Sequence, residues 1–372
     1  MRIGIDAKSF FRGPVSTRVV LQNLLPELFS LFPEHEWIIF LDKKDKHFQF
    51  PVHSVNVKLI YLWADINFIS NVFLLTGKLR SNRVDAIVYQ TFPSIMHKVP
   101  AITFIHDVLF REYSQFFTWK ELLYFFPISW LARNRSDRLI ATTTYVSNDL
   151  LKYNYTNSKS RIDLVPLAVS NDYKPIEHQD PKKLEAVKVK YALPDQFLLF
   201  VGRLNVRKNI ENLLRAVMLI RDAQIQLVIV GKADWKTPDL KELLSKPELK
   251  KRIIMAGAME DNELVLTYSM AKIFCFPSFA EGFGLPPLEA MASGVPVIVS
   301  KTTALPEVCG NAAIYTDPYS PESIALAIDT LLDNSELYEA QKLKGIQKAK
   351  QFNWTHSARA FMKSISNAVN NQ

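Results

Sequence analysis

The sequence predicts an α/β protein built from two doubly wound, Rossmann-like parallel sheets that face each other across a cleft. The chain has 372 residues, more than one hydrophobic core usually holds, so two domains are expected. Short apolar runs alternate with longer amphipathic runs throughout, as they do when helices connect parallel strands. A polar stretch with three prolines, residues 170–194, divides these runs into two series. Such sheets bind ligands at the carboxyl ends of their strands, so the cleft is the expected ligand site.

Each series contains candidate strands that are short, apolar and bounded by polar or turn residues. In the first series they are Ile3–Ile5, Trp37–Leu41, Ala86–Tyr89, Ile102–Ile105, Leu139–Ala141 and Asp163–Val165. In the second series they are Phe197–Val201, Gln226–Val230, Ile253–Ala256, Ile273–Phe276, Val297–Val299 and Ala313–Tyr315.

Composition limits the class of protein. Hydrophobic residues make up 48% of the chain and charged residues 22%, which is ordinary for a globular protein. Cys275 and Cys309 are too few for a disulfide framework or a zinc site, which favours the reducing cytoplasm. The start, MRIGIDAKSF, lacks the long apolar core of a secretory signal, and the longest apolar stretch, Leu122–Ala132, is shorter than the roughly 20 residues that span a bilayer. We expect a cytoplasmic protein that is not integral to a membrane.

The most informative stretch is FAEGFGLPPLEAMASGVPVIVS, residues 279–300. It follows the strand Ile273–Phe276. Its two glycines, Gly282 and Gly284, permit a tight turn, and the two prolines after them suit the first turn of a helix. We expect a short helix over Leu288–Ser293 that ends at Gly294, where glycine adopts the left-handed conformation. The stretch therefore predicts a strand, loop, helix and strand of a parallel sheet.

The carboxylates of this stretch indicate its ligand. Free N–H groups at a helix start attract anions, so a phosphate is the expected guest of the loop. A phosphate would repel Glu281 and Glu289, and these side chains are therefore expected to accept hydrogen bonds from hydroxyl groups. A nucleotide sugar carries both kinds of group. The alternative is that Glu289 only interacts favourably with the dipole of its helix.

A second loop supplies cations. In FLLFVGRLNVRKNIENLLRAV the strand Phe197–Val201 is followed by a turn, and Asn209 is a suitable N-cap for the next helix. Arg203 and Lys208 lie between the strand and the helix, where they suit a diphosphate. The alternative is that both are solvated loop cations. Arg207, beside Lys208, is interpreted as a solvated bystander.

These motifs together resemble the retaining GT-B glycosyltransferases of family GT4. The resemblance extends over nearly the whole chain, through GIDAKSF, FIHDVLFREYSQFF, SDRLIATTTYVSNDLL, GRLNVRKN, FAEGFGLPPLEAMASGVPVIVS and FNWTHSARAF. It implies an N-terminal acceptor-binding domain, residues 1–175, on which residues 356–372 pack back. It implies a C-terminal donor-binding domain, residues 176–355.

The resemblance also implies a role for each candidate residue. Arg203 and Lys208 would hold the donor diphosphate, Glu281 would contact hydroxyls of the donor sugar, and Glu289 would contact the ribose. His106 would face the donor sugar, and Asp107 would orient its loop. The sugar and phosphate would lie against the backbone N–H groups of Gly282, Phe283, Gly284 and Leu285. The base would lie against Gly257 to Met259.

The chain departs from the family in the loop after the first strand, which is commonly rich in glycine. Here the loop reads FRGPVSTRVV, in which Gly13 has no second glycine beside it and Pro14 stiffens the turn. We expect side-chain donors of Ser16, Thr17 and Arg18 to substitute for close approach of the backbone.

No D-x-D motif is present, so no metal and no cofactor is expected, and the nucleotide sugar is a substrate. Retention, implied by the family, is expected to proceed by front-face displacement, because no carboxylate is evident as a covalent nucleophile. The resemblance favours GDP-mannose or a related donor, with UDP sugars as the alternative, and polysaccharide or lipopolysaccharide synthesis as the process. Two other classes remain open: a nucleotide-sugar epimerase of the same fold, and a non-catalytic binding or scaffold protein. No nucleic-acid-binding motif is present.

The net charge of +8 includes a basic window at residues 111–161, with 8 Lys/Arg against 4 Asp/Glu. Within it, apolar residues recur near helical spacing and are followed by three arginines. The apolar residues are Trp119, Leu122, Leu123, Phe126 and Trp130, and the arginines are Arg133, Arg135 and Arg138. Aromatic residues beside cations suit contact with an anionic membrane through residues 119–138, and a lipid-linked acceptor would give that contact a purpose. The alternative is core packing, with Pro127 interrupting the helix.

Overall fold

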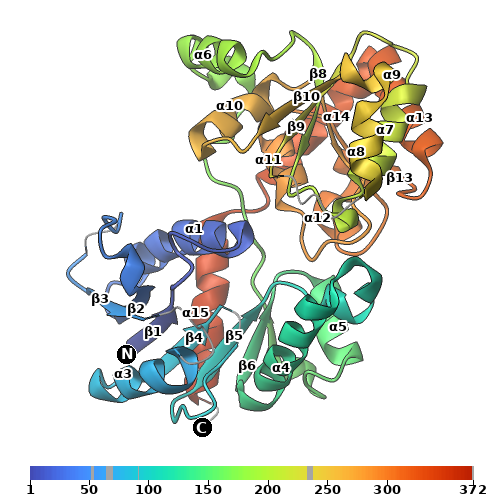
Figure 1. Cartoon of the computed structure of the whole chain (residues 1–372). Helices are drawn as coiled ribbons and strands as arrows, with labels where there is room; N and C mark the ends of the chain where they lie inside the picture. Colours follow the sequence, from blue (N-terminus) through green and yellow to red (C-terminus); the bar gives the residue numbers. More distant parts are fainter. Residues whose placement is uncertain (52–53, 64–69, 91, 233–237, 371–372) are drawn as a thin grey trace. The chain divides into compact units, whose positions relative to one another are not determined.

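The computed structural model describes residues 1–51, 54–63, 70–90, 92–232 and 238–370, which form two compact units (Figure 1). Unit 1 contains residues 1–167 and the C-terminal segment from Asn353, and unit 2 contains Ala168–Phe352. The first boundary therefore lies before the expected division at residues 175/176. The C-terminal segment joins unit 1 from residue 353, slightly earlier than the expected residue 356.

Unit 1 contains a parallel sheet of seven strands in the order β3-β2-β1-β4-β5-β6-β7. The strands are β1 (Arg2–Asp6), β2 (Glu36–Asp42), β3 (Val57–Leu62), β4 (Ala86–Tyr89), β5 (Ala101–Ile105), β6 (Arg138–Ala141) and β7 (Ile162–Leu164). Sequence analysis missed β3. It lies at the edge of the sheet and is mostly half-buried, and its apolar run, Leu59 to Leu62, directly follows the charged Lys58.

The helices of unit 1 are α1 (Val15–Leu31), α3 (Thr76–Ser81), α4 (Trp119–Arg135), α5 (Thr144–Lys152) and α15 (Trp354–Asn370). Shorter helical turns are η1 (Lys43–Asp45), η2 (Ser70–Leu75), η3 (Leu109–Arg111), η4 (Ser114–Phe116) and η5 (Lys159–Arg161). Helix α15 lies against α1 and the sheet in Figure 1. The Thr355 hydroxyl donates to Glu27 at 2.8 Å, and the Ser364 hydroxyl donates to Asp163 at 2.7 Å. These bonds tie the C-terminal helix to unit 1.

Unit 2 contains a second parallel sheet, with six strands in the order β10-β9-β8-β11-β12-β13. The strands are β8 (Phe197–Val201), β9 (Gln226–Val230), β10 (Ile253–Gly257), β11 (Ile273–Phe276), β12 (Val297–Ser300) and β13 (Ala313–Thr316). The helices are α6 (Pro181–Tyr191), α7 (Ile210–Leu219), α8 (Pro238–Ser245), α9 (Pro247–Lys250), α10 (Asp261–Met270), α11 (Leu285–Ala292), α12 (Leu305–Cys309), α13 (Pro321–Asp333) and α14 (Ser335–Ala349). Shorter turns are η6 (Ile176–His178), η7 (Val206–Lys208) and η8 (Gly310–Ala312). The expected strands of this series are all present.

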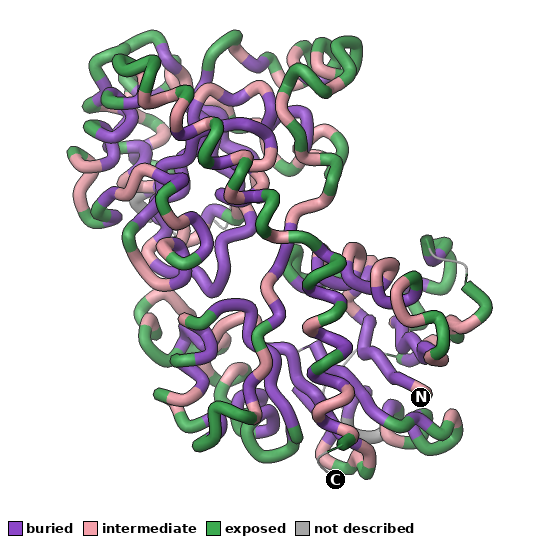
Figure 2. Tube along the Cα trace, turned by 180° about the vertical axis from the view of Figure 1, so that it is seen from behind, coloured by how far each residue is buried: buried purple, intermediate pink, exposed green. Residues whose placement is uncertain are grey.

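The inner strands form the cores of both units. The inner strands are buried, whereas the outer helices carry both buried and exposed residues, as Figure 2 shows. Strand β11, with the sequence IFCF, is completely buried, which explains why an unbroken apolar run predicted it. Burial raises the pKa of the Cys275 thiol, as expected for an inert core cysteine. Among the described residues, none of the helices combines the length and the hydrophobicity needed to cross a bilayer.

Helix α4 corrects two expectations about the basic window. A capping box of Thr118 and Glu121 starts the helix, which then continues through Pro127 without interruption. Pro127 and Leu123 are exposed, so the Leu123 carbonyl that lacks a helical N–H partner can be hydrated.

Arg138 is not part of a surface patch. It is buried and forms a two-pronged ion pair with Asp163, at 2.6 and 2.8 Å.

Candidate active site

In the loop from β11 to α11, Gly284 has the backbone geometry that favours glycine. Gly284 has φ of 105°, and a Cβ there would lie 2.7 Å from the Leu305 side chain. Helix α11 begins at Leu285, three residues before the expected start, because both prolines fit into its first turn. Gly294, with φ of 75°, follows the end of the helix as expected.

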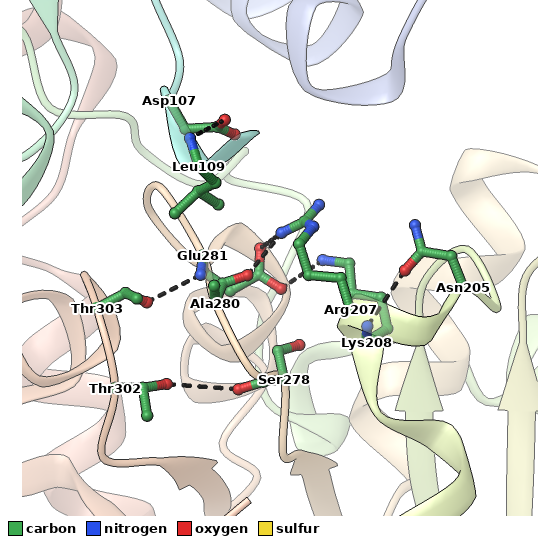
Figure 3. Close-up of polar contacts among 10 residues, drawn as sticks. All are labelled: Asp107, Leu109, Asn205, Arg207, Lys208, Ser278, Ala280, Glu281, Thr302 and Thr303. Atoms are coloured by element: carbon green, nitrogen blue, oxygen red, sulfur yellow. Dashed lines mark hydrogen bonds and ion pairs between the residues drawn. The ribbon is translucent and has the colours of Figure 1, made fainter. Parts of the chain in front are cut away.

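Glu281 is the centre of a buried ionic cluster (Figure 3). Its residue is only 7% exposed, and its backbone N–H donates to the Thr303 hydroxyl at 2.9 Å. Oε1 accepts from Lys208 Nζ at 2.6 Å, and Oε2 accepts from Arg207 Nη1 at 3.2 Å. Burial alone would raise the pKa of Glu281, but the adjacent Lys208 and Arg207 outweigh it and hold the pKa below its usual value. The carboxylate is therefore ionised.

Arg207 is not a solvated bystander, and that expectation is wrong. Besides Glu281, Nη1 donates to the Ala280 carbonyl at 2.6 Å, and the N–H of Phe279 donates to the Arg207 carbonyl at 2.9 Å. These bonds join the loop after β8 to the loop after β11. Arg203, in contrast, is exposed, in the turn after Gly202. The structure therefore brings Lys208 and Arg207 to Glu281 and leaves Arg203 at the surface of the same loop.

Asn209 corrects another expectation, because its side chain does not cap α7. The residue has φ of 56°, and its amide donates across the unit to the carbonyls of Pro277, at 2.8 Å, and Pro318, at 2.6 Å. Asn205 caps the preceding turn, η7, by accepting from the Lys208 N–H at 3.2 Å. The turn fixes the backbone that carries Lys208.

Glu289 lies on α11 within a cluster of phenols. The Tyr268 hydroxyl, from α10, donates to Glu289 Oε2 at 2.8 Å, and Tyr173 lies close enough to favour the ionised form of the same carboxylate. The two phenol rings meet edge to face, with centroids 5.5 Å apart. Burial raises the pKa of Glu289 to about 7, although both phenols act in the opposite direction. Sequence analysis missed both tyrosines, because neither belongs to a motif and each is distant from Glu289 in the chain.

Further predicted donor-site residues line the same edge of this sheet. Gly257 ends β10 with φ of 72°, and its carbonyl accepts from the Gly231 N–H at 2.7 Å. Met259 accepts through sulfur from the Thr267 hydroxyl at 3.3 Å. Phe283 is buried and meets Phe352 edge to face, so its side chain serves packing while its backbone belongs to the loop. Strands β8, β10 and β11 end at this edge, which is why distant segments gather there.

In unit 1, His106 follows β5. Its Nε2 lies 3.5 Å from the Thr17 hydroxyl of α1, and its ring packs against Phe104 with centroids 4.8 Å apart. Burial lowers the pKa of His106 to about 4, so the imidazole is neutral near pH 7. Asp107 accepts from the Leu109 N–H at 3.2 Å, a local bond of the kind that orients a loop.

The loop after β1 holds the residues that depart from the family. A Cβ at Gly13 would lie 2.6 Å from the Ser9 Cβ, so this glycine permits a close approach within the loop. At the start of α1, Ser16 is exposed, Thr17 is buried against His106, and Arg18 is half-buried. Of these three residues, the structure thus places Thr17 beside another candidate site residue, His106.

A polar network at the end of β1 was not foreseen. Lys8 Nζ donates to Asp6 Oδ1 at 2.6 Å and to Asn71 Oδ1 at 2.6 Å, and all three residues are buried. The Asn71 amide donates to the Phe92 carbonyl at 3.1 Å. The network joins the carboxyl ends of neighbouring strands β1 and β4. Asp6 and Lys8 stand in the GIDAKSF motif, which gave no indication of Asn71.

Comparison with known proteins identifies both units. Residues 19–173 match the profile of Glycosyltransferase Family 4, and residues 183–348 match that of Glycosyl transferases group 1. Two solved structures share the fold over nearly the full length of both chains. Sucrose-phosphate synthase from Thermosynechococcus elongatus has a TM-score of 0.77 at 20% identity, covering 98% of each chain. WaaG, a glycosyltransferase involved in lipopolysaccharide biosynthesis, has a TM-score of 0.75 at 17% identity, covering 98% of this chain and 99% of its own.

Related sequences carry mannosyltransferase names. O-antigen chain mannosyltransferase B from Escherichia coli is 35% identical over 223 residues, which are 59% of this chain and 58% of the relative. Serotype-specific mannosyltransferase WbdA from Escherichia coli is 29% identical over 229 residues, which are 60% of this chain and 28% of the relative. The match thus spans less than two thirds of either relative. Both domain profiles, the two parallel sheets and these relatives establish that the chain belongs to the GT4 family of GT-B glycosyltransferases.

Proposed function

We propose that the chain is a retaining hexosyltransferase that moves a sugar from a nucleoside-diphosphate donor to a glycan or lipid-linked acceptor in cell-surface polysaccharide synthesis. The observation that carries the proposal is the cluster of Lys208, Arg207 and Glu281 at the loop before α11. It places cations for a diphosphate beside a carboxylate for hydroxyls, which is the combination that a nucleotide sugar requires. The O-antigen mannosyltransferase names of the relatives support this process and mannose as the transferred sugar, and we propose GDP-mannose as the donor.

The donor is expected to bind to unit 2. Lys208 and the exposed Arg203 can neutralise the diphosphate, together with N–H groups from Gly282 to Leu285 at the start of α11. Because Lys208 is already paired with Glu281, a diphosphate would share or replace that pairing. Glu281 would then accept from hydroxyls of the donor sugar, and Glu289 from the ribose. Residues 257–259 would lie against the base.

Transfer breaks the bond between C1 of the sugar and the diphosphate oxygen and forms a bond from C1 to the acceptor oxygen on the same face. The departing diphosphate oxygen takes the acceptor proton, which makes a protein nucleophile unnecessary. Cations and N–H groups stabilise the leaving charge in place of a metal ion. The neutral imidazole of His106 would hydrogen-bond the donor sugar, with Thr17 beside it. The products are a nucleoside diphosphate and a glycoside of retained configuration.

The test combines binding with product analysis. The native chain is titrated with GDP, UDP, ADP and their common sugar conjugates, with magnesium and with EDTA. A ligand at about 100 times its Kd stabilises the fold by roughly 2.7 kcal/mol, which raises the melting temperature by a few degrees. We expect a shift with one nucleotide series that persists in EDTA and is lost in Lys208→Met. The absence of any shift would refute the donor site, and loss of the shift in EDTA would refute metal independence.

Products then distinguish the classes of enzyme. With donor and a membrane extract as acceptor, a transferase releases nucleoside diphosphate and labels the glycan. An epimerase converts the donor sugar without any acceptor, and that outcome would contradict the proposal. The anomeric configuration of the product tests retention, and a trapped glycosyl-enzyme adduct would overturn front-face displacement.

The exposed face of α4 supports peripheral contact with an anionic membrane. Its side chains follow helical spacing and point to one side: Trp119 is 69% exposed, Leu123 67%, Phe126 44% and Trp130 59%. Cations border this face. The Arg111 guanidinium lies 4.6 Å from the centre of the Phe126 ring. Exposed aromatic residues beside cations suit the interface of an anionic bilayer, where a lipid-linked acceptor would be found.

Vesicle sedimentation tests this contact. Phosphatidylcholine vesicles with and without phosphatidylglycerol are mixed with the native chain and with a Trp119→Ser, Trp130→Ser double variant. We expect binding to anionic vesicles that the double variant loses. The control is Leu326→Ser, which removes an equally exposed apolar side chain from α13 of unit 2. Equal binding of the native chain and the double variant would refute the α4 contact.

A further inference from the structure

Two phenols from separate parts of unit 2 lie beside Glu289. Tyr268 lies on α10 and is completely buried, and its hydroxyl donates to Glu289 Oε2 at 2.8 Å. Tyr173 comes from the segment between Ala168, where unit 2 begins, and η6, and it favours the ionised form of the same carboxylate. Tyr173 packs on Tyr268 edge to face and is half-buried. The carboxylate is thus bound by Tyr268, whose ring is in turn packed by Tyr173.

The surroundings of Glu289 are otherwise apolar or negatively charged. Strands β11 and β12 contribute buried, largely apolar sequences, and α14 approaches α11 through Gly345, whose position lies against Met291. Asp261, on α10, acts on Glu289 electrostatically and raises its pKa further. No cation acts on Glu289 among the described groups that shift its pKa, in contrast to Glu281. The phenol hydroxyls are therefore the groups that favour the ionised carboxylate.

We propose that Tyr268 and Tyr173 are positioning residues: both hydroxyls favour the ionised form of the Glu289 carboxylate and the Tyr268 hydroxyl orients it, so that it can accept a hydrogen bond from the ribose of the donor nucleotide. This inference rests on the proposed function, since it assigns the ligand hydroxyl to that donor. An ionised carboxylate has free lone pairs after accepting the bond from Tyr268, so it can accept from the ligand as well. A protonated carboxyl has less acceptor capacity and would bind the ribose more weakly.

The inference predicts a characteristic pH dependence. Because the pKa of Glu289 is about 7, nucleotide affinity of the native chain should increase as pH rises through 7. Removing one donor by Tyr268→Phe raises this pKa further, since a hydrogen bond to the charged form is lost. If the pKa rises by about one unit, the ionised fraction at pH 7 falls from about a half to about a tenth. Affinity should then fall about fivefold at pH 7 and approach that of the native chain near pH 9.

Calorimetric titration with the nucleoside diphosphate that binds best, from pH 5.5 to 9, tests this. The variants are Tyr268→Phe, Tyr173→Phe and Glu289→Gln. At each pH the affinity of each protein is divided by the affinity of Glu289→Gln. This ratio cancels the pH dependence that comes from the nucleotide phosphates. Tyr338→Phe is the matched control, because its hydroxyl donates to the Lys272 carbonyl at 3.0 Å elsewhere in unit 2. We expect both cluster variants to shift the ratio profile to higher pH and the control to leave it unchanged.

The outcomes separate the inference from the proposed function. If the native chain binds no nucleotide, the proposed function fails and the positioning role fails with it. If nucleotide binds but the phenol variants lower affinity equally at every pH, or not at all, only the positioning role is overturned. If Tyr268→Phe does not fold, Tyr173→Phe alone decides, because its half-buried ring can lose the hydroxyl with little loss of packing.

Discussion

The ion pair between Lys208 and Glu281 provides a quantitative test of the donor-site geometry. A double-mutant cycle uses Lys208→Met, Glu281→Gln and the double variant. The side chains are 13% and 9% exposed, and the atoms Nζ and Oε1 are 2.6 Å apart. Both substitutions roughly preserve volume, so the cycle reports the charge interaction rather than packing.

The expected loss of unfolding free energy depends on which charge each substitution leaves without its partner. Lys208→Met leaves a buried carboxylate with Arg207 alone, at 3.2 Å, so the free energy of unfolding should fall by about 2–4 kcal/mol, towards the lower end of the range for broken buried pairs. Glu281→Gln keeps an acceptor oxygen but leaves two cations without a counter-charge, at a cost of about 1–3 kcal/mol. The free-energy cost of the double variant should be smaller than the sum of the two single-variant costs by about 1–3 kcal/mol.

Urea unfolding of each variant measures these values, with the transition of unit 2 fitted separately, since two units can unfold in separate steps. Coupling should change little between low and moderate salt, because the pair is shielded from solvent. The control cycle uses Lys188 and Asp195, an exposed pair in the same unit, for which no measurable coupling is expected. If the double variant costs as much as the two single substitutions added together, the coupling is zero, as in the control. That result would refute the buried ion pair of Lys208 and Glu281.

Three further predictions concern Asn209, Glu289 and His106. Asn209→Ala removes two bonds, to the Pro277 and Pro318 carbonyls, and forces alanine into a left-handed conformation, so the free energy of unfolding should fall by about 2–4 kcal/mol in urea melts; an unchanged midpoint would contradict this. The folded pKa of Glu289, about 7, lies above the ordinary 4.5, so the native fold loses stability as pH rises through this interval. Glu289→Gln removes this loss and should therefore gain about 2–3 kcal/mol relative to the native chain between pH 4.5 and pH 8. Parallel pH curves of the two proteins would argue against a raised pKa. The folded pKa of His106, about 4, lies below the ordinary 6.5, so the native chain should lose about 2 kcal/mol of its free energy of unfolding as pH falls from 7 to 5. In thermal melts His106→Gln should lose less over the same interval. A larger loss in the variant would refute a buried neutral imidazole.

Much of the architecture was predictable because it depends on local patterns. Inner strands such as β8 and β11 are buried on both faces, so a short unbroken apolar run is enough to identify them. The edge strand β3 was missed although Leu59 to Leu62 form an unbroken apolar run as long as that of β11. Pro127 misled the prediction of α4, since a proline on a solvent-exposed side leaves the helix intact.

The candidate site was predictable in its residues but not in its pairings. Glycine and proline spacing, with local charge, pointed to Lys208, Glu281 and Glu289 from sequence alone. Only the tertiary structure decided that Lys208 and Arg207 meet Glu281 across 73 and 74 positions. It also decided that the Tyr268 hydroxyl binds Glu289. The physical reason is that parallel strands bring distant loops to one sheet edge, where burial and neighbouring charges set each pKa and each hydrogen bond, and no local pattern encodes those neighbours.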